Sequence, residues 1–125
     1  MESSRKTGTR YEGIAAAYLE EKGYRILEKN YRNRSGEIDL IAETIDQDEQ
    51  IFVFVEVKYR KNTACGHPAE AVSYAKQKKI SNTAMYYLLR HGLMPDTPCR
   101  FDVIAIYGDG TIWHMENAFE FCGRF

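Results

Sequence analysis

The stretch FVFVEVKYR, residues 52–60, sets a carboxylate and an ammonium group inside an otherwise apolar strand. Alternate residues of a strand share a face, so Glu56 and Lys58 point the same way, roughly 7 Å apart. A second acid, Asp39, lies upstream in the apolar stretch EIDLIAE. Two carboxylates suit a hard cation such as Mg²⁺ or Mn²⁺, and a nearby lysine stabilises charge on a phosphoryl group. These residue types therefore point to metal-assisted hydrolysis of a phosphodiester bond.

These three side chains can meet only if two strands pair as a hairpin. Residues 37–43 and 51–60 alternate as strands do, and the polar segment 44–50 predicts a hairpin loop between them. Antiparallel pairing through that loop places Asp39 beside Glu56. The later strand is apolar on both faces, which is typical of a central strand covered on both sides. The alternative is that Glu56 and Lys58 form a surface ion pair on an edge strand.

A first helix is predicted ahead of this hairpin. Thr9 and Glu12 fit a capping box, T-x-x-E, so the helix is expected to begin at Thr9 and to end at Gly23. A capping role would by itself explain Glu12.

The second half of the chain predicts further helices and strands. Ser73 fits the N-cap of a helix that ends at Gly92, and Pro68 favours a short helix over 68–72. Other strands are expected over 24–32, 100–107 and 111–115. The order α-β-β-β-α-β-β predicts an α/β fold, a mixed β-sheet of about five strands flanked by helices.

Composition limits the class of protein. A chain of 125 residues with 44% hydrophobic and 28% charged residues fits one soluble domain, 1–125. We expect no membrane association, because no apolar run is long enough for a span, and the N-terminus lacks a signal-peptide core. A cytoplasmic location is the default expectation. The three cysteines are too far apart for a disulfide framework, and Cys65 with His67 does not extend to a zinc-finger spacing.

Charge is unevenly distributed, although the net charge is only −1. Residues 37–56 carry seven acids and no base, whereas residues 58–79 carry six basic residues and one acid. If these regions meet in space, basic walls could grip a polyanion while the acids hold cations. Solvated faces are the simpler interpretation. The candidate phosphate-binding residues are Arg34, Arg60, Lys61, Lys76, Lys78 and Lys79.

The ordered motifs resemble a known family. The segments YEGIAAAYLEEKGYRILEKNYR, GEIDLIAE, FVFVEVKYR, AEAVSYAKQKKI and RFDVIAI cover residues 11–106 and are similar to those of the bacterial YraN family of endonuclease-like proteins. GEIDLI followed by FVEVKYR also resembles the D…(E/D)-x-K core of the PD-(D/E)XK nuclease superfamily. The resemblance implies a restriction-endonuclease-like core.

Carried over residue by residue, the resemblance implies that Asp39 and Glu56 are metal ligands and that Lys58 is the catalytic lysine. It implies that Glu12 completes the site, and that Gln77 or Lys76 reaches the metal water or the phosphate. Gln77 also lies on the apolar stripe of its helix, where a polar residue needs a partner. One departure is Ile38, which stands where the superfamily motif has proline.

Several other residues have structural interpretations. Arg100 and Asp102 suggest a structural ion pair at a strand start. The large aromatic residues are expected in the core rather than on a stacking surface, and the three histidines show no catalytic pattern. The aromatic residues are Tyr86, Tyr87, Phe101 and Trp113, and the histidines are His67, His91 and His114.

The sequence thus predicts a metal-dependent nuclease acting on nucleic acid, with DNA favoured and recognition by structure or ends. A homodimer, which is possible for this chain, would carry two such sites. One alternative is a nucleic-acid-binding module with a nuclease fold and little or no catalysis. Another is a protein-interaction scaffold that uses the acidic loop 43–50.

Overall fold

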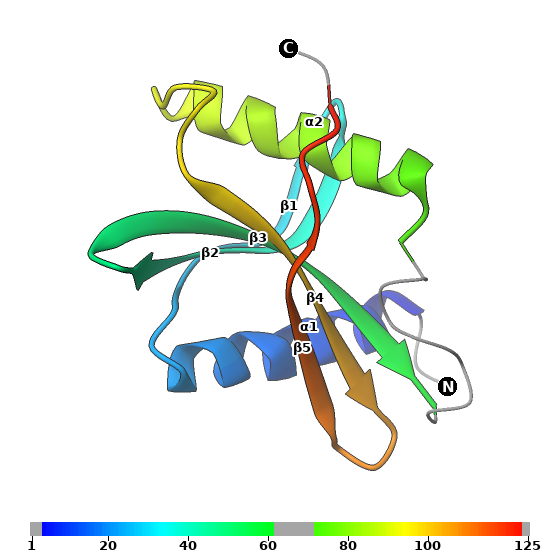
Figure 1. Ribbon diagram of the computed structural model, residues 1–125. Helices are drawn as coiled ribbons and strands as arrows, with labels where there is room; N and C mark the ends of the chain where they lie inside the picture. The colour runs from blue at the N-terminus through cyan, green and yellow to red at the C-terminus, as the bar shows by residue number, and fades with distance from the viewer. Residues whose placement is uncertain (1–3, 62–71, 124–125) are drawn as a thin grey trace.

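A computed structural model describes residues 4–61 and 72–123 of the chain, with side chains from residue 10 onward. Two helices and five strands follow one another in the predicted order (Figure 1). They are α1 (Ser4–Glu21), β1 (Arg25–Asn33), β2 (Gly36–Asp46), β3 (Glu49–Arg60), α2 (Tyr74–Arg90), β4 (Cys99–Tyr107) and β5 (Ile112–Phe119). The predicted short helix 68–72 and the pair Cys65 and His67 fall on residues outside the described ranges, Val72 excepted.

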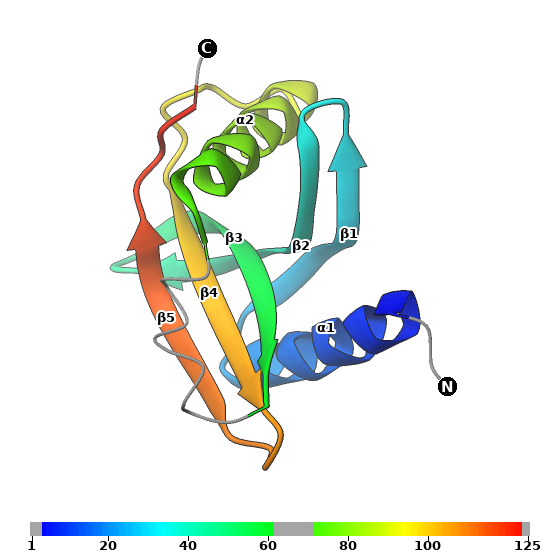
Figure 2. The same ribbon diagram turned by 90° about the vertical axis from the view of Figure 1, so that its right-hand side faces the viewer.

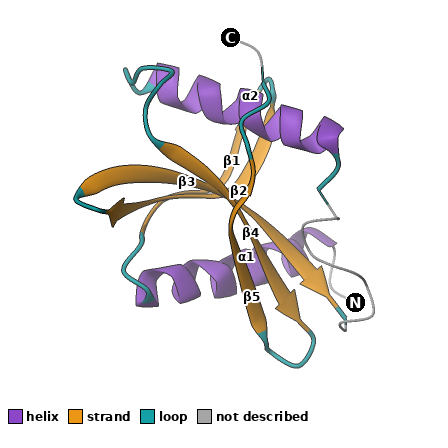
Figure 3. Ribbon diagram, in the orientation of Figure 1, coloured by secondary structure: helices purple, strands orange, loops and turns teal. Residues whose placement is uncertain are grey.

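The strands form one mixed sheet in the order β1-β2-β3-β4-β5. Neighbouring strands are antiparallel except β3 and β4, which run parallel and are joined through α2. The two helices lie on opposite faces of this sheet (Figure 3). β3 is therefore the central strand, as its two apolar faces predicted, and the edge-strand alternative for Glu56 and Lys58 is wrong.

Each face of the sheet has its own core. Phe52, Phe54 and Phe101 pack with Ile80 and Leu88 of α2 on one side. On the other side, Val53, Val55, Ile104 and Ile106 pack with Ala15, Ala16 and Leu19 of α1. The alternating side chains of β3 supply both cores, which fixes this strand between the two helices.

The start of α1 corrects one prediction. The helix begins by Ser4, five residues before the predicted cap at Thr9. Glu12 therefore lies about two turns inside the helix, where no backbone amide is free for a capping box. The capping interpretation of Glu12 is wrong, and the burial of this carboxylate needs another explanation.

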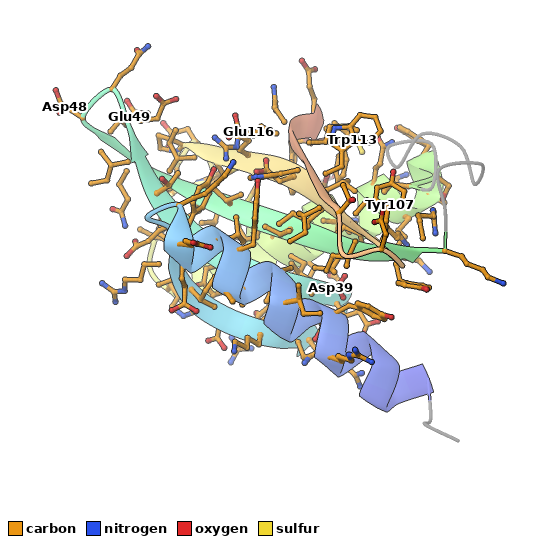
Figure 4. The ribbon with its side chains drawn as sticks, turned by 90° about the horizontal axis from the view of Figure 1, so that it is seen from below. Asp39, Asp48, Glu49, Tyr107, Trp113 and Glu116 are labelled. Carbon is orange, nitrogen blue, oxygen red and sulfur yellow. The ribbon has the colours of Figure 1, made fainter. Side chains whose placement is uncertain are left out.

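The hairpin between β2 and β3 is tighter than predicted. The strands extend to Asp46 and from Glu49, and the turn is only Gln47 and Asp48 (Figure 4). Both turn residues have positive φ, 51° and 65°, as in a type I′ turn. Such turns favour Asn and Gly, so this Gln-Asp pair gave a weak signal and the segment 44–50 was wrongly assigned as a loop. The acids at this hairpin end, Asp46, Asp48 and Glu49, are exposed, so a scaffold function that uses them stays a prediction.

Two other expectations differ from the structure. β5 continues to Phe119, four residues beyond its predicted end, because Ala118 and Phe119 join the core on the α2 side. Tyr86 and Trp113 are 43% and 42% exposed, although both were expected in the core; Tyr87 and Phe101 are buried as expected.

Ser73 caps α2 as predicted, because its hydroxyl oxygen accepts a hydrogen bond from the backbone N–H of Lys76 at 3.2 Å. Ser73→Ala is expected to lower the free energy of unfolding by about 1 kcal/mol, since that amide loses its partner. Urea unfolding would measure the change. Ser73→Asp keeps an accepting oxygen and should retain most of the stability; equal losses in both variants would contradict a capping role.

Candidate functional site

The two central strands separate where the predicted acids lie. The antiparallel pairing of β2 with β3 ends at Leu40 opposite Val55, and one further step would set Asp39 opposite Glu56. Instead of continuing the ladder, the backbone N–H of Val57 donates to Oδ2 of Asp39 at 2.8 Å. Figure 4 labels Asp39 between α1 and the sheet. The structure thus brings Asp39 and Glu56 together, as the hairpin argument predicted.

Glu12 of α1 completes this group of acids. Its side chain is buried, at 8% exposure, and hydrogen-bonds with the side chains of Asp39 and Asn30. Its second oxygen, Oε2, is buried without a hydrogen-bond partner among the described residues. Such an unsatisfied carboxylate oxygen is costly unless it has another ligand.

Glu56 is held by two lysines. Its Oε1 lies 2.9 Å from Nζ of Lys76 on α2 and 3.5 Å from Nζ of Lys58 on the same strand. Glu56 is almost fully buried, whereas the Lys76 side chain is 42% exposed. The site therefore combines three acids and two lysines from α1, β2, β3 and α2.

The surroundings of Asp39 and Glu12 favour the protonated forms of these two acids. Burial is the largest cause and raises the pKa of Asp39 to about 8, with the negative charge of Glu56 adding to the effect. Burial also raises the pKa of Glu12, although its hydrogen bond with Asp39 opposes that shift. At neutral pH, Asp39 and Glu12 therefore share a proton, which relieves the repulsion between adjacent carboxylates.

The pKa values of the two lysines shift in opposite directions. Burial lowers the pKa of Lys58, and the neighbouring ammonium of Lys76 lowers it further. Burial also acts to lower the pKa of Lys76, but contact with the Glu56 carboxylate outweighs it and the net shift is upward. Lys58 is consequently the better proton donor of the two, and Lys76 stays charged.

The chemistry of the donors fits a hard cation. Carboxylate oxygens are the ligands that Mg²⁺ and Mn²⁺ prefer, and Oε2 of Glu12 is a buried oxygen in need of one. Among the described residues, however, no three His, Cys, Asp or Glu side chains are gathered closely enough to enclose a metal ion. A proton between Glu12 and Asp39, and the ammonium of Lys76 at Glu56, supply positive charge in this conformation.

The remaining predicted residues lie farther from the acids or face other partners. The side-chain amide of Gln77 donates to the carbonyl of Val72 at 3.0 Å, which gives this half-buried residue a structural partner. Arg60 donates to the carbonyl of Tyr59, and Lys61 is exposed. Glu37, close to the acids in sequence, is exposed and pairs with Arg32 at 3.0 Å. α2 carries Lys78 and Lys79, and the β1–β2 turn carries Arg34.

The sequence interpretation missed one buried polar cluster. The Arg100–Asp102 pair is present as predicted, at 2.9 Å, but Nε2 of His114 also lies 2.7 Å from Asp102. The interpretation of His114 as incidental is therefore wrong. His114 and Asp102 would occupy neighbouring strands in any antiparallel pairing of β4 and β5, and that was the available signal.

Comparisons with known proteins agree with the sequence resemblance at the family level. UPF0102 proteins of Lachnoclostridium phytofermentans and Clostridioides difficile are 48% and 46% identical to this chain over 116 and 118 residues. The alignments cover 93% and 94% of this chain and 94% and 99% of those relatives. A UPF0102 protein of Marinobacter nauticus is 50% identical over 105 residues, 84% of this chain and 81% of its own.

A solved structure, Pyrococcus furiosus SfsA in complex with Ca²⁺, aligns with 98% of this chain and 66% of its own. The sequence identity is 14% and the TM-score 0.35, which is too low to establish a shared fold. No helix in the described part of the chain is long and apolar enough to cross a bilayer. Residues 11–106 match the model of one protein family, and the chain belongs to it: the uncharacterised protein family UPF0102.

Proposed function

We propose that this protein is a metal-dependent nuclease that hydrolyses phosphodiester bonds in nucleic acid, with DNA as the first candidate substrate. The observation that carries the proposal is the convergence of Glu12, Asp39 and Glu56 with Lys58 where β2 and β3 separate. A fold gains no stability from crowding two buried acids, Glu12 and Glu56, against the half-buried Asp39, so their presence is best explained by a ligand. The resemblance to the PD-(D/E)XK core points to the same chemistry.

In this proposal, Asp39 and Glu56 hold Mg²⁺ or Mn²⁺, with Glu12 beside them. When bound, such a cation supplies an activated water and neutralises charge on the scissile phosphate. Lys58 donates hydrogen bonds from Nζ to the phosphate oxygens, and its lowered pKa suits transfer of a proton to the leaving oxygen. Glu12 and Asp39 give up their shared proton when the cation binds.

A binding module without catalysis is the second candidate, and the ion pair of Glu56 with Lys76 favours it. At 2.9 Å, this ammonium engages the carboxylate oxygen that a metal would need. A protein that retains such a pair in the presence of nucleic acid would bind without cleaving. The two candidates differ in what divalent cations do to the substrate.

Cleavage of labelled single-stranded, duplex, flapped and four-way DNA and of RNA, with Mg²⁺ and with Mn²⁺, tests the proposal. We expect Lys58→Ala to reduce the cleavage rate by about 100-fold or more, because the charge developing on phosphate loses its stabilising ammonium. Glu56→Gln, which preserves shape and removes a ligand charge, should abolish metal-dependent cleavage. Glu20→Gln, a change to an exposed acid on α1 away from the site, should leave the rate unchanged.

Wild-type protein that binds these substrates but cuts none of them in either metal would favour the binding module. Cleavage that survives Glu56→Gln would show that activity arises elsewhere in the protein or in the preparation.

A further inference from the structure

A basic pocket of about 520 Å³ lies beside the C-terminal half of α2, at the opposite end of that helix from Lys76. It is lined by Tyr31, Arg32, Asn33, Arg34, Tyr86 and Arg90. Three of these six residues carry guanidinium groups, of which that of Arg32 is paired with Glu37 at 3.0 Å. None of the lining residues is acidic, and Arg34 and Arg90 supply the remaining positive charge. Figure 2 shows the turn between β1 and β2 rising beside α2, which is how the two walls come together.

The walls of this pocket are held together by hydrogen bonds. The side-chain amide of Asn33 donates to the carbonyl of Thr83 on α2 at 3.2 Å, and Oδ1 of Asn33 accepts from the backbone N–H of Ser35 at 2.9 Å. Gly36, with φ of 151°, approaches Thr83 so closely that an added Cβ would lie 3.1 Å from its hydroxyl oxygen. The β1–β2 turn is thus fixed against the helix, and the arginines beside it have a defined setting.

The basic residues continue along α2 towards the acids. Lys76, Lys79, Tyr86 and Arg90 are spaced at helical intervals and share one face. A second pocket, of about 380 Å³, lies at the N-terminal end of α2, and its charged lining residues are Lys76, Lys79 and one acid, Glu37. From Lys76 to Arg90 the face is about 21 Å long. It ends at Glu56, which Lys76 contacts.

We propose that this face of α2 and the β1–β2 turn bind a single-stranded segment of nucleic acid and lead it to Glu56. Arg34, Arg90 and Lys79 contact successive phosphates, and Tyr86 stacks on a base. The part of the inference that leads the nucleic acid to Glu56 rests on the proposed function. Binding of the nucleic acid to this face does not require catalysis.

The exposed tyrosine is what favours a single strand over a duplex. The Tyr86 side chain is 43% exposed on a rigid helix beside the arginines. An aromatic ring can stack only on a base whose face is uncovered, and in a duplex the neighbouring pairs cover both faces. A pocket of this volume also accepts a ligand of nucleotide size.

Fluorescence anisotropy with a labelled single-stranded oligonucleotide, with EDTA present so that no cleavage occurs, tests the inference. The double variant Arg34→Ala with Arg90→Ala is expected to bind at least about tenfold more weakly. Its plot of log affinity against log salt concentration should be less steep, by the amount that corresponds to roughly two lost phosphate contacts. Tyr86→Leu should weaken single-strand binding by about tenfold, and duplex binding by much less.

Two variants serve as controls. Arg25→Ala removes an exposed arginine at the other end of β1, and Trp113→Leu removes an aromatic of matched exposure on β5. Both should bind as wild type does.

Several results would overturn the inference. They are no binding to single strands in EDTA, affinity unchanged in the Arg34 and Arg90 double variant, or Tyr86→Leu weakening duplex and single strand equally. Failure of the proposed function would look different, because binding would persist in wild type and in Glu56→Gln while no substrate was cut.

Discussion

Replacing Asp102 with Ala is expected to lower the free energy of unfolding by about 3–5 kcal/mol at pH 7, because it leaves the half-buried guanidinium of Arg100 without its anion. Asp102 is fully buried on the central part of β4. Its carboxylate accepts from Nε and Nη2 of Arg100, both at 2.9 Å, and from the backbone N–H of Asn117 at 3.0 Å. His114 adds a fourth contact at 2.7 Å.

The cluster extends from the core to the surface. Nη2 of Arg100 also contacts the hydroxyl of Tyr24, and that hydroxyl donates to Glu116 at 3.3 Å. Asp102 therefore ties β4 to β5 and to the segment after α1. Its loss should cost more than an ordinary hydrogen bond, since several buried donors lose one common acceptor.

The pH dependence of this cluster follows from the pKa of Asp102. Burial acts to raise it, but hydrogen bonds from His114, Arg100 and Asn117 outweigh burial, and the net shift is downward. A depressed carboxyl pKa gives stability that is present above the unfolded value of about 4 and is lost as pH falls through the lower folded value. Wild type should therefore lose stability in that acid range more steeply than Asp102→Asn.

Urea unfolding between pH 3 and pH 7 measures both effects. Asp96→Ala, which removes an exposed acid between α2 and β4, is the matched control and should unfold at the wild-type urea concentration. An Asp102→Ala variant as stable as this control would contradict the assigned role of the cluster.

Asp39→Asn is expected to make the metal-free protein more stable above about pH 8, while removing its response to divalent cations. The raised pKa of Asp39, about 8 against 3.8 for the free side chain, means that the folded chain keeps a proton which the unfolded chain has lost. The free energy of unfolding therefore falls as pH rises from about 4 to about 8, by at most about 1.4 kcal/mol per pH unit.

Asparagine mimics the protonated acid and does not titrate. Its carbonyl oxygen can accept from Val57, and its amide can donate to Glu12 as the shared proton does. The variant and wild type should therefore be similar near pH 4, and the variant should become increasingly more stable up to about pH 8. Chemical denaturation in EDTA at a series of pH values measures this difference.

Divalent cations are expected to stabilise folded wild-type protein and to leave the stability of Asp39→Asn unchanged. Mg²⁺ or Mn²⁺ above pH 8 should raise the melting temperature of wild type, because binding to the ionised carboxylates stabilises the folded state. Calorimetry in buffers of different ionisation enthalpy should detect proton release below pH 8. Glu20→Gln, which changes an exposed acid of α1, is the matched control. A stability difference that does not change with pH, or a metal response that persists in Asp39→Asn, would contradict this account.

Local patterns in the sequence were sufficient to predict the main helices and strands and to place Asp39, Glu56 and Lys58 of the candidate site together. The alternating apolar residues of 51–60 predicted a central strand with Glu56 and Lys58 on one face, and the hairpin connection predicted Asp39 beside Glu56. Ser73 and Gly92 marked the ends of α2. These signals succeed because side-chain direction and hairpin register depend on residues that are close in the chain.

Contacts between distant elements were decided only by tertiary packing. Glu12 satisfied a capping motif in the sequence, but α1 begins earlier and packs so that this carboxylate reaches Asp39. Nothing local linked Lys76 to Glu56, or Tyr86 to the arginines of the β1–β2 turn. The sequence by itself determined which residues share a face of each helix and strand. The twist of the sheet and the seating of α1 and α2 decided which faces meet, because burial of apolar surface depends on the whole fold.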